Sequence, residues 1–198
     1  MIKNIIFDIG GVIWKGNHSS ILDKLNLSLK EKDEIGKVYF KPWLKVDLGK
    51  ETINERFSSC KFSFKINNDI KDKLINFYKY REFNYDVINL INKLKEKGFN
   101  IYILSNNNKE AINYLKGLDI LKNIDGWIVS CDTHLMKPSE EIYKALLNKF
   151  NLNPHECYFI DDKEKNINAA KKLGIDGYIF KNTDDLINDM IDKKIIKN

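Results

Sequence analysis

The sequence predicts an α/β protein built on a doubly wound parallel sheet, with a small helical unit inserted after the first strand. Short, nearly continuous apolar segments alternate with stretches that have helical apolar periodicity, and this alternation is typical of parallel sheets. Residues 15–84 interrupt the alternation and contain helical patterns only. The chain has 198 residues. Because domains usually contain about 50–250 residues, this length suits one core with a small insert.

Five segments are predicted as strands because they are rich in β-branched and aromatic residues. A strand that is buried on both faces needs a continuous apolar run of this kind. The segments are IKNIIFDI at 2–9, NIYIL at 100–104, WIVS at 127–130, CYFI at 157–160 and GYIF at 177–180.

Helices are predicted between the later strands. Val87, Leu90, Ile91 and Leu94 form a stripe at helical spacing that stops before Gly98, a residue suited to a helix C-terminus. Pro138 is expected to open the next helix, because proline is favoured in the first turn. Two further helices are expected over residues 164–173 and 183–191.

The insert is expected to be a bundle of short helices. Thr52-Ile-Asn-Glu55 is a capping-box pattern, and Ile70, Leu74 and Phe77 recur at helical spacing. The predicted organisation is therefore a core of residues 1–14 and 85–198 with a helical cap of residues 15–84. The cap would lie over the carboxyl ends of the strands, where open α/β sheets bind ligands.

Composition excludes several classes of partner and location. The chain carries 33 basic and 28 acidic residues, a net charge of +5, and Arg56 and Arg81 are the only arginines. Arginine is the residue best suited to bidentate contacts with bases and phosphates, so we expect no nucleic-acid partner. No apolar run approaches the ~18 residues of a membrane span, and Asp8 interrupts the early apolar run, which argues against a signal peptide.

The three cysteines, Cys60, Cys131 and Cys157, are odd in number and lack CxxC spacing. This pattern predicts neither a disulfide framework nor a zinc site, and it is typical of reduced thiols. We therefore expect a cytoplasmic protein without a membrane partner. The sequence leaves open whether it is a monomer or a homodimer.

Polar residues follow the predicted strands at the points where the strands end. Asp8 closes the first strand, Ser105-Asn106 the second and Asp161-Asp162 the fourth, while Lys137 precedes the helix expected at Pro138. In a parallel sheet these side chains would meet at one edge. Three carboxylates in one crevice repel one another unless a cation lies between them, and oxygen ligands with open positions suit Mg²⁺.

These residues together predict a site for phosphoryl transfer. Lys137 would add a fixed positive charge, and Ser105 and Asn106 would offer a hydroxyl and backbone N–H groups to an anion at a helix N-terminus. A carboxylate nucleophile in such a site can form an aspartyl-phosphate, which divides one difficult step into two.

The motifs FDIGGV, LSNN, KP before a helix and FIDDxxxN, in this order, resemble those of the haloacid dehalogenase superfamily of phosphohydrolases. The resemblance covers the core segments on both sides of the insert. It implies a Rossmann-like core with a small helical cap after the first strand. The form of the first motif is similar to a branch that includes phosphatases resembling bacterial α-D-glucose-1-phosphate phosphatase.

The resemblance implies a metal site at the strand ends. Asp8 and Asp162 would be side-chain ligands of Mg²⁺, Gly10 would contribute its backbone carbonyl, and Asp161 would support the metal indirectly or through water. Asn166 would orient the loop that carries the acidic pair.

The resemblance also implies the catalytic and substrate-binding residues. Asp8 would be the nucleophile that attacks phosphorus, and Lys137 would offset charge on Asp8 and on the phosphoryl group. Ser105, Asn106 and Lys137 would bind that group in a small phosphorylated metabolite, with a sugar phosphate favoured.

One position departs from the pattern of the family's phosphatases. Most of them have a second Asp two residues after the nucleophile, which acts as general acid and then base, and this sequence has Gly10 there. Loss of such a group typically costs about 10²–10⁴-fold in rate. The sugar-phosphate branch lacks this Asp as well. A leaving group of low pKa, such as an anomeric hydroxyl, would lessen the need for protonation, and water or a cap residue could supply the rest, with His18 as the nearest titratable candidate.

Two alternatives to a phosphatase remain open. A 2-haloacid dehalogenase would use the same Asp nucleophile without a metal, although the acidic pair Asp161-Asp162 argues against it. A catalytically weak relative that binds a phosphate ligand or a protein is the other alternative, because of Gly10. His134 is expected to be a structural or rim residue, and Trp43 to pack within the cap or core, with substrate contact as the lesser possibility.

Overall fold

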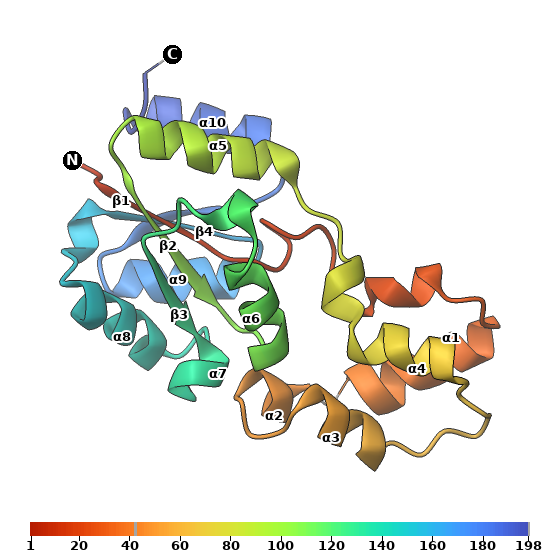
Figure 1. Ribbon diagram of the computed structural model, residues 1–198. Coiled ribbons are helices and arrows are strands. Elements are labelled where there is room, and N and C mark those ends of the chain that lie inside the picture. The colour runs from red at the N-terminus through yellow and green to blue at the C-terminus, as the bar shows by residue number, and fades with distance from the viewer. Residues whose placement is uncertain (42, 198) are drawn as a thin grey trace.

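The computed structural model describes residues 1–41 and 43–197, with the backbone alone described for His18. Its centre is a five-stranded parallel sheet in the order β3-β2-β1-β4-β5, which confirms the predicted doubly wound α/β fold (Figure 1). The strands are β1 (Asn4–Phe7), β2 (Asn100–Ser105), β3 (Gly126–Val129), β4 (Cys157–Asp161) and β5 (Asp176–Ile179).

Helices cover both faces of the sheet because successive strand side chains point to opposite sides. Ile5 and Phe7 of β1 face α5 (Tyr85–Glu96), α6 (Lys109–Lys116) and α10 (Thr183–Asp192). Ile6, between them, faces α8 (Glu140–Phe150) and α9 (Glu164–Lys172) on the other side. The short α7 (Ser130–Thr133) follows β3, and single turns η4 (Asp119–Leu121) and η5 (Pro154–Glu156) precede β3 and β4.

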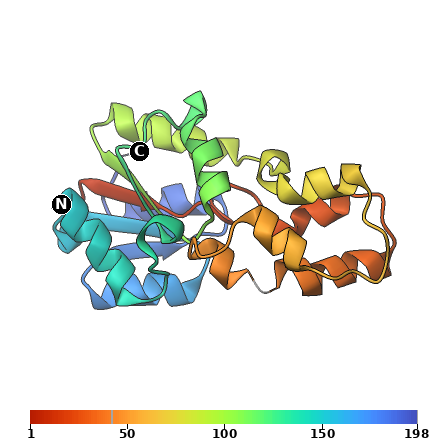
Figure 2. The same ribbon diagram turned by 60° about the horizontal axis from the view of Figure 1, so that its bottom comes forward.

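The segment between β1 and α5 forms a separate group of short helices beside the sheet (Figure 2). It has its own apolar cluster, in which Tyr39, Phe40, Trp43 and Phe77 pack against one another. Its elements are η1 (His18–Lys24), α1 (Leu29–Ile35), η2 (Gly36–Phe40), α2 (Leu44–Asp47), α3 (Ile53–Ser59), α4 (Asn68–Ile75) and η3 (Phe77–Tyr80). We refer to residues 15–84 as the cap and propose that they act as one unit.

Local sequence explains where the cap helices start. Ser28 and Thr52 each form a complete capping box, with Glu31 and Glu55 respectively. In each box the hydroxyl oxygen accepts from a backbone N–H of the first turn, and the glutamate accepts from the N-cap N–H, so two otherwise unpaired donors are satisfied.

Two expected boundaries differ from the observed ones. β1 is shorter than the predicted 2–9, because the chain turns away after Asp8 and Gly11 adopts φ +78°, a left-handed conformation that suits glycine. The prediction that Pro138 opens a helix is wrong: α8 begins at Glu140, with Ser139 as its N-cap residue. Pro138 lies in a turn in which the Ser139 N–H donates to the Met136 carbonyl.

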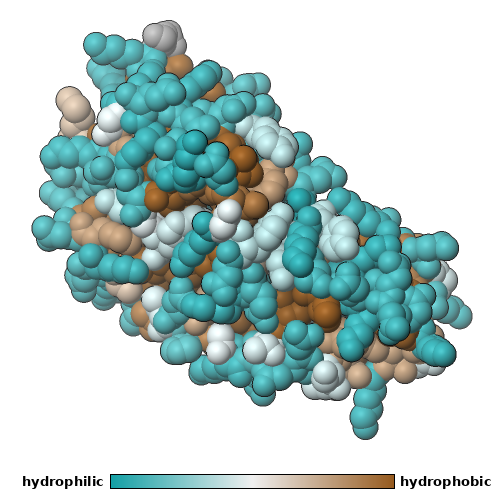
Figure 3. Space-filling model, in the orientation of Figure 1, coloured by the Kyte–Doolittle hydropathy of each residue, from teal (hydrophilic) through white to brown (hydrophobic). Residues whose placement is uncertain are grey.

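The surface is mostly hydrophilic on the face shown in Figure 3. Among the described residues, no helix combines the length and the apolar character needed to cross a bilayer. Cys60, Cys131 and Cys157 are all free thiols, as the spacing predicts. The carboxyl ends of β1, β2 and β4 meet on the side of the sheet nearest the cap.

Candidate active site

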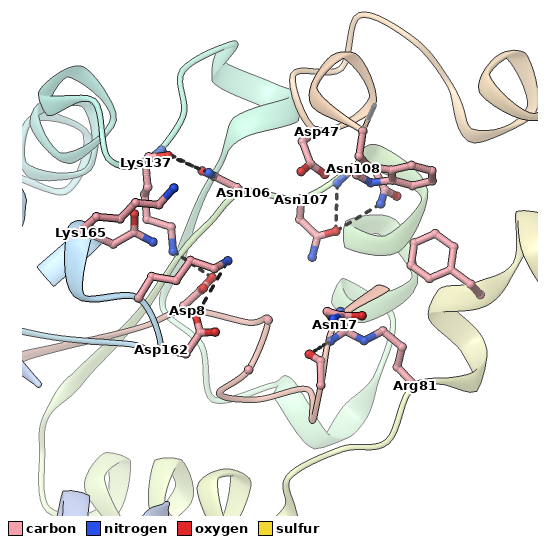
Figure 4. Close-up of a pocket in the computed structure, with 17 residues that line it drawn as sticks. Asp8, Asn17, Asp47, Arg81, Asn106, Asn107, Asn108, Lys137, Asp162 and Lys165 are labelled. Carbon is pink, nitrogen blue, oxygen red and sulfur yellow. Dashed lines mark hydrogen bonds and ion pairs between the residues drawn. The ribbon is translucent and has the colours of Figure 1, made fainter. Parts of the chain in front are cut away.

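A cavity of about 500 Å³ lies between the carboxyl ends of the strands and the cap (Figure 4). The core contributes residues from the loops after β1, β2 and β4 and from the turn before α8. The cap contributes residues from four separate places along its sequence. The lining residues with polar or aromatic side chains are Asp8, Asn17, Trp43, Asp47, Phe77, Arg81, Asn106, Asn107, Asn108, Lys137, Asp162, Lys163, Lys165 and Asn166.

Lys137 is the centre of a buried charge cluster behind the cavity. Its side chain is 1% exposed, and its ammonium contacts Asp8 Oδ1 at 2.9 Å and Asp161 Oδ2 at 2.6 Å. The ammonium also donates to the Leu104 carbonyl at 2.8 Å. An ammonium has three hydrogens, and these three contacts use all of them. Lys137 therefore offsets negative charge from a fixed position.

Asp8 is buried, and its geometry leaves one oxygen for chemistry. The Ile9 N–H donates to Oδ1 at 2.7 Å, and this is the same oxygen that contacts Lys137. Oδ2 is the oxygen that these two groups leave to a substrate or a metal. Burial raises the pKa of Asp8, the Lys137 ammonium opposes that rise, and the negative charge of Asp161 adds to it.

The two acidic residues after β4 have different surroundings. Asp161 is fully buried and accepts from Lys137, from the Asn166 side-chain amide and from the Lys163 N–H. Asp162 is exposed to the cavity beside Asp8 (Figure 4), and burial raises the pKa of its carboxyl. Oxygens of Asp8, Asp161 and Asp162 lie within 4.8 Å of one another, so one cation could contact several of them.

The loop after β2 presents donors to the cavity. The Ser105 hydroxyl is buried close enough to Asp8 to lower its pKa, yet no group among the described residues forms a geometrically complete hydrogen bond with it. Asn108 caps α6 by accepting from the Ala111 N–H at 2.9 Å. The start of α6 therefore faces the site, and the N-terminus of a helix favours anions.

Asn106 lines the cavity, but its side-chain amide is already engaged. Its Nδ2 donates to the Lys137 carbonyl at 2.9 Å, and its Oδ1 accepts from the Lys137 N–H at 2.8 Å. This two-bond clamp holds the backbone of Lys137 against the loop after β2. The structure thus brings Asp8, Gly10, Asn106, Lys137 and Asp162 to the cavity wall, with Ser105 and Asp161 buried behind it.

The cap closes the cavity with residues that no sequence motif marks. Trp43 and Phe77 form an aromatic wall, and their ring centroids are 5.5 Å apart. Trp43 also packs in the cap cluster, so the prediction of packing is confirmed, while substrate contact by Trp43 stays a prediction. The side chain of His18 lies outside the described part of the chain, so its candidacy is not tested.

Arg81 reaches the cavity from the end of the cap. Its guanidinium stacks over Trp14 with 4.6 Å to the ring centroid, and it donates to the carbonyls of Lys15 and Gly16. Burial lowers the pKa of Arg81 to about 10, against the opposing effect of Asp8 and Asp162. At neutral pH it is therefore a cation that faces the acidic edge.

The cap is attached to the core beside this cavity by contacts at residues 47–49. Ser130 Oγ donates to the Asp47 carbonyl at 2.6 Å and accepts from the Asn107 N–H at 2.9 Å, so one hydroxyl joins the cap to the loop after β2. The His134 ring contacts the Leu48 carbonyl at 2.7 Å, in agreement with the structural role expected for it. Gly49 has φ +65°, and a Cβ there would lie 2.4 Å from the Cys131 carbonyl oxygen.

Asp47 is a cap residue whose carboxyl group lines the cavity and has a strongly raised pKa. Burial raises its pKa to about 7, and Asp8 adds to the rise, while Lys163 and a hydrogen bond from Trp43 lower it. Its side chain projects into the cavity across from Asp8 and Asp162 (Figure 4). No sequence motif marks Asp47. Its single local signal is its place two residues before Gly49, whose φ of +65° and closeness to Cys131 suit glycine.

A buried Asp–Lys–Asp cluster thus lies at the carboxyl edge of a parallel sheet. Comparison with family models identifies the class of hydrolase to which the chain belongs. The model of the haloacid dehalogenase-like hydrolases matches residues 2–174, so the chain belongs to this family.

The chain is also similar to individual proteins of known activity. Bifunctional epoxide hydrolase 2 of Rattus norvegicus is 28% identical over 153 residues, which are 75% of this chain and 27% of that protein. (S)-2-haloacid dehalogenase 4A of Burkholderia cepacia is 29% identical over 53% of this chain and 46% of that one. The chain thus spans about a quarter to a half of the length of these relatives. D-ribitol-5-phosphate phosphatase of Bacteroides thetaiotaomicron is 24% identical over 90% of this chain and 91% of that enzyme.

Solved structures share the fold. A haloacid dehalogenase family enzyme from Bacteroides thetaiotaomicron, in complex with magnesium and inorganic phosphate, has a TM-score of 0.73 and 23% identity. The match covers 91% of this chain and 95% of that one. L-2-haloacid dehalogenase of Xanthobacter autotrophicus has a TM-score of 0.66 and 16% identity over 99% of this chain and 85% of that one.

Proposed function

We propose that this hydrolase is a Mg²⁺-dependent phosphatase that acts on a small phosphorylated metabolite through an aspartyl-phosphate on Asp8. The observation that carries this proposal is the charge inventory of the cavity. Oxygens of three carboxylates, Asp8, Asp161 and Asp162, lie within 4.8 Å of one another, and the buried Lys137 ammonium contacts Asp8 and Asp161. A divalent cation beside these carboxylates would leave the site with positive charge for the dianion of a phosphate monoester.

The residues present fit Mg²⁺. Oxygens of three carboxylates lie within 4.8 Å of one another, and burial raises the pKa of Asp8 and of Asp162, so a cation near them would relieve an unfavourable charge. Asp8, Asp162 and the carbonyl of Gly10 would hold the ion. The acceptor positions of Asp161 are occupied by protein donors, which suits an indirect role through water. When bound, Mg²⁺ would neutralise charge on the transferring phosphoryl group.

The chain's own residues account for the remaining chemistry. The Asp8 carboxylate would attack phosphorus and form the new P–O bond while the bond to the leaving oxygen breaks. The Ser105 hydroxyl and the N–H groups at the start of α6 would hold phosphoryl oxygens, and Lys137 would offset charge on Asp8. Water would then attack the aspartyl-phosphate, releasing inorganic phosphate and regenerating the Asp8 carboxylate.

A sugar or polyol phosphate is the substrate class that the cavity favours. The aromatic wall of Trp43 and Phe77 would cover one apolar face of such a ligand, and the side chains of Asn17, Asn107 and Arg81 would bind hydroxyls. The volume of about 500 Å³ suits a small metabolite. The similarity to a D-ribitol-5-phosphate phosphatase over nearly the whole chain supports the same class.

A 2-haloacid dehalogenase is the second candidate, because a haloacid dehalogenase matches about half of the chain at 29% identity. Halide leaves without protonation and without a metal, so that reaction gives no reason for a third carboxylate beside Asp8. The exposure of Asp162 to the cavity therefore favours the phosphatase.

The test is a panel of sugar, polyol, nucleotide and acyl phosphates with Mg²⁺ or chelator, together with 2-haloacids. We expect Mg²⁺-dependent phosphate release that Asp8→Asn abolishes and that Asp72→Asn, an exposed carboxylate on α4, leaves unchanged. Activity that persists in chelator or in Asp8→Asn would contradict the mechanism. Halide release would identify a dehalogenase, and inactivity on every substrate would favour a role in binding only.

A further inference from the structure

We propose that Asp47 of the cap is the general acid and base of this enzyme, in the role that the residue at position 10 cannot perform. The inference rests on the proposed phosphatase function and extends it to a residue outside the family's motifs. It follows from where Asp47 lies, what holds it there and what is missing beside the nucleophile.

The need for a proton donor is a property of position 10. Gly10 has no side chain, and the space that a Cβ would occupy has no atom within 4 Å. An alkoxide that leaves a sugar or polyol phosphate is a strong base, so its departure requires a proton from a nearby acid. Asp8 is the attacking group, while Lys137 directs its hydrogens to Asp8, Asp161 and the Leu104 carbonyl. Neither can serve as the donor.

Asp47 lies on the correct side of the cavity. In phosphoryl transfer the attacking and leaving oxygens are roughly in line on opposite sides of phosphorus. Asp8 would attack from the core side, so the leaving oxygen would face the cap. Asp47 projects into the cavity from the cap, across from Asp8 and Asp162 (Figure 4).

The backbone of Asp47 is joined through Ser130 to the loop after β2, the loop proposed to hold the phosphoryl group. Ser130 Oγ contacts the Asp47 carbonyl at 2.6 Å and the Asn107 N–H at 2.9 Å. Gly49 follows two residues later in close contact with Cys131, and His134 contacts the Leu48 carbonyl. These contacts make Asp47 a fixed part of the closed cavity, as an acid that must meet one oxygen requires.

The protonation of Asp47 suits the role. Its pKa of about 7 means that a proton is present on a substantial fraction of molecules near neutral pH. Aspartate in water would be almost fully ionised there, because its pKa is about 3.9. The titratable and charged groups that line the cavity with Asp47 or contact its turn are Asp8, Asp162, Arg81, Lys163, Lys165 and His134.

The Asp47 carboxyl donates its proton to the leaving oxygen as the P–O bond breaks, giving the free alcohol and the Asp47 carboxylate. Water enters the position that the alcohol vacates, and the Asp47 carboxylate takes one of its protons as the water oxygen bonds to phosphorus. The bond between phosphorus and Asp8 then breaks, which restores Asp8 as a carboxylate and Asp47 as an acid.

The test compares Asp47→Asn with the wild type, both saturated with Mg²⁺, on an alkyl phosphate and on p-nitrophenyl phosphate. With the alkyl phosphate we expect kcat to fall by about 10²–10⁴-fold. Nitrophenolate leaves without protonation, so the variant should release one equivalent of it in a rapid burst and then turn over slowly, because the base for the second step is also missing. The decline of kcat/KM above about pH 7 with the alkyl phosphate should disappear in the variant.

Asp47→Glu should recover part of the alkyl phosphate activity, and Asp72→Asn should match the wild type throughout. The proposal is overturned if Asp47→Asn hydrolyses the alkyl phosphate at the wild-type rate. It is also overturned if both substrates lose activity equally without a burst, since this would indicate a structural role. A wild type inactive on both substrates would instead refute the phosphatase function itself.

Discussion

Replacing Asp47 by asparagine is expected to make the protein more stable while making it a poorer enzyme. The carboxyl is desolvated between the cap and the core, and this burial raises its pKa from the ordinary 3.8 to about 7. The folded state therefore binds the proton more tightly than the unfolded state does. Stability is greatest where both states are protonated and falls as the pH rises from about 4 towards 7, above which the loss is constant.

The size of the effect follows from that difference in pKa. At about 1.4 kcal/mol for each pH unit, it corresponds to about 4 kcal/mol of stability lost by the wild type at pH 8. Asparagine is neutral at every pH, so Asp47→Asn avoids this loss. We expect the free energy of unfolding of the variant to exceed that of the wild type by up to about 4 kcal/mol at pH 8, and by much less at pH 4–5.

Urea unfolding of both proteins in metal-free buffer at pH 5 and at pH 8 measures this difference directly. The repulsion between Asp47 and Asp8 is one of the causes of the raised pKa, so its relief is already part of this figure. The exposed control Asp72→Asn should stay within about 0.5 kcal/mol of the wild type at both pH values. An Asp47→Asn variant no more stable than the wild type at pH 8, or equally stabilised at both pH values, would refute this account of the site.

Three further predictions test the core of the site and the attachment of the cap. Lys137→Met leaves Asp8 and Asp161 buried without their counter-ion, so urea unfolding at pH 7 should show that the free energy of unfolding falls by about 3–5 kcal/mol. The control Lys144→Met breaks an exposed ion pair with Glu140 and should lower it by less than about 1 kcal/mol. Ser130→Ala removes the hydroxyl shared by Asp47 and Asn107 and should cost about 1–3 kcal/mol in the same assay; an unchanged midpoint would show that this hydroxyl does not hold the cap. Gly49→Ala should make the cap more sensitive to limited proteolysis, because the new Cβ would lie 2.4 Å from the Cys131 carbonyl oxygen. The control Gly98→Ala has a similar φ of +86° and no atom within 4 Å of the new Cβ, so it tests left-handed strain alone. Equal protease sensitivity of the two variants would refute the role of the contact with Cys131.

The parallel sheet was predictable because its cause is local. Each strand segment is an uninterrupted apolar run, and such runs separated by helical stripes can be buried only in a sheet covered on both faces. The same locality explains the site residues of the core. Asp8, Ser105 and Asp161 stand at the ends of strands, so parallel topology alone brings them to one edge, and four motifs in order mark them within the sequence.

The error at Pro138 has a comparably local origin. The sequence rule that places proline in the first helical turn does not distinguish a helix start from a turn that precedes one. Ser139 is the N-cap residue, a position at which serine is favoured, and α8 starts one residue after it.

The part of the site contributed by the cap depended on contacts between segments far apart in the chain. The amino-acid sequence by itself determined the α/β class and the places of Asp8 (the proposed nucleophile), the acidic pair and the lysine, because strand ends and short motifs fix their positions. Only the tertiary structure decided that Trp43, Asp47 and Arg81 face that nucleophile and that the side chain of Asn106 clamps Lys137. The reason is physical: Asp47 reaches the cavity through a hydrogen bond to Ser130, 83 residues away, and no local pattern encodes such a docking contact.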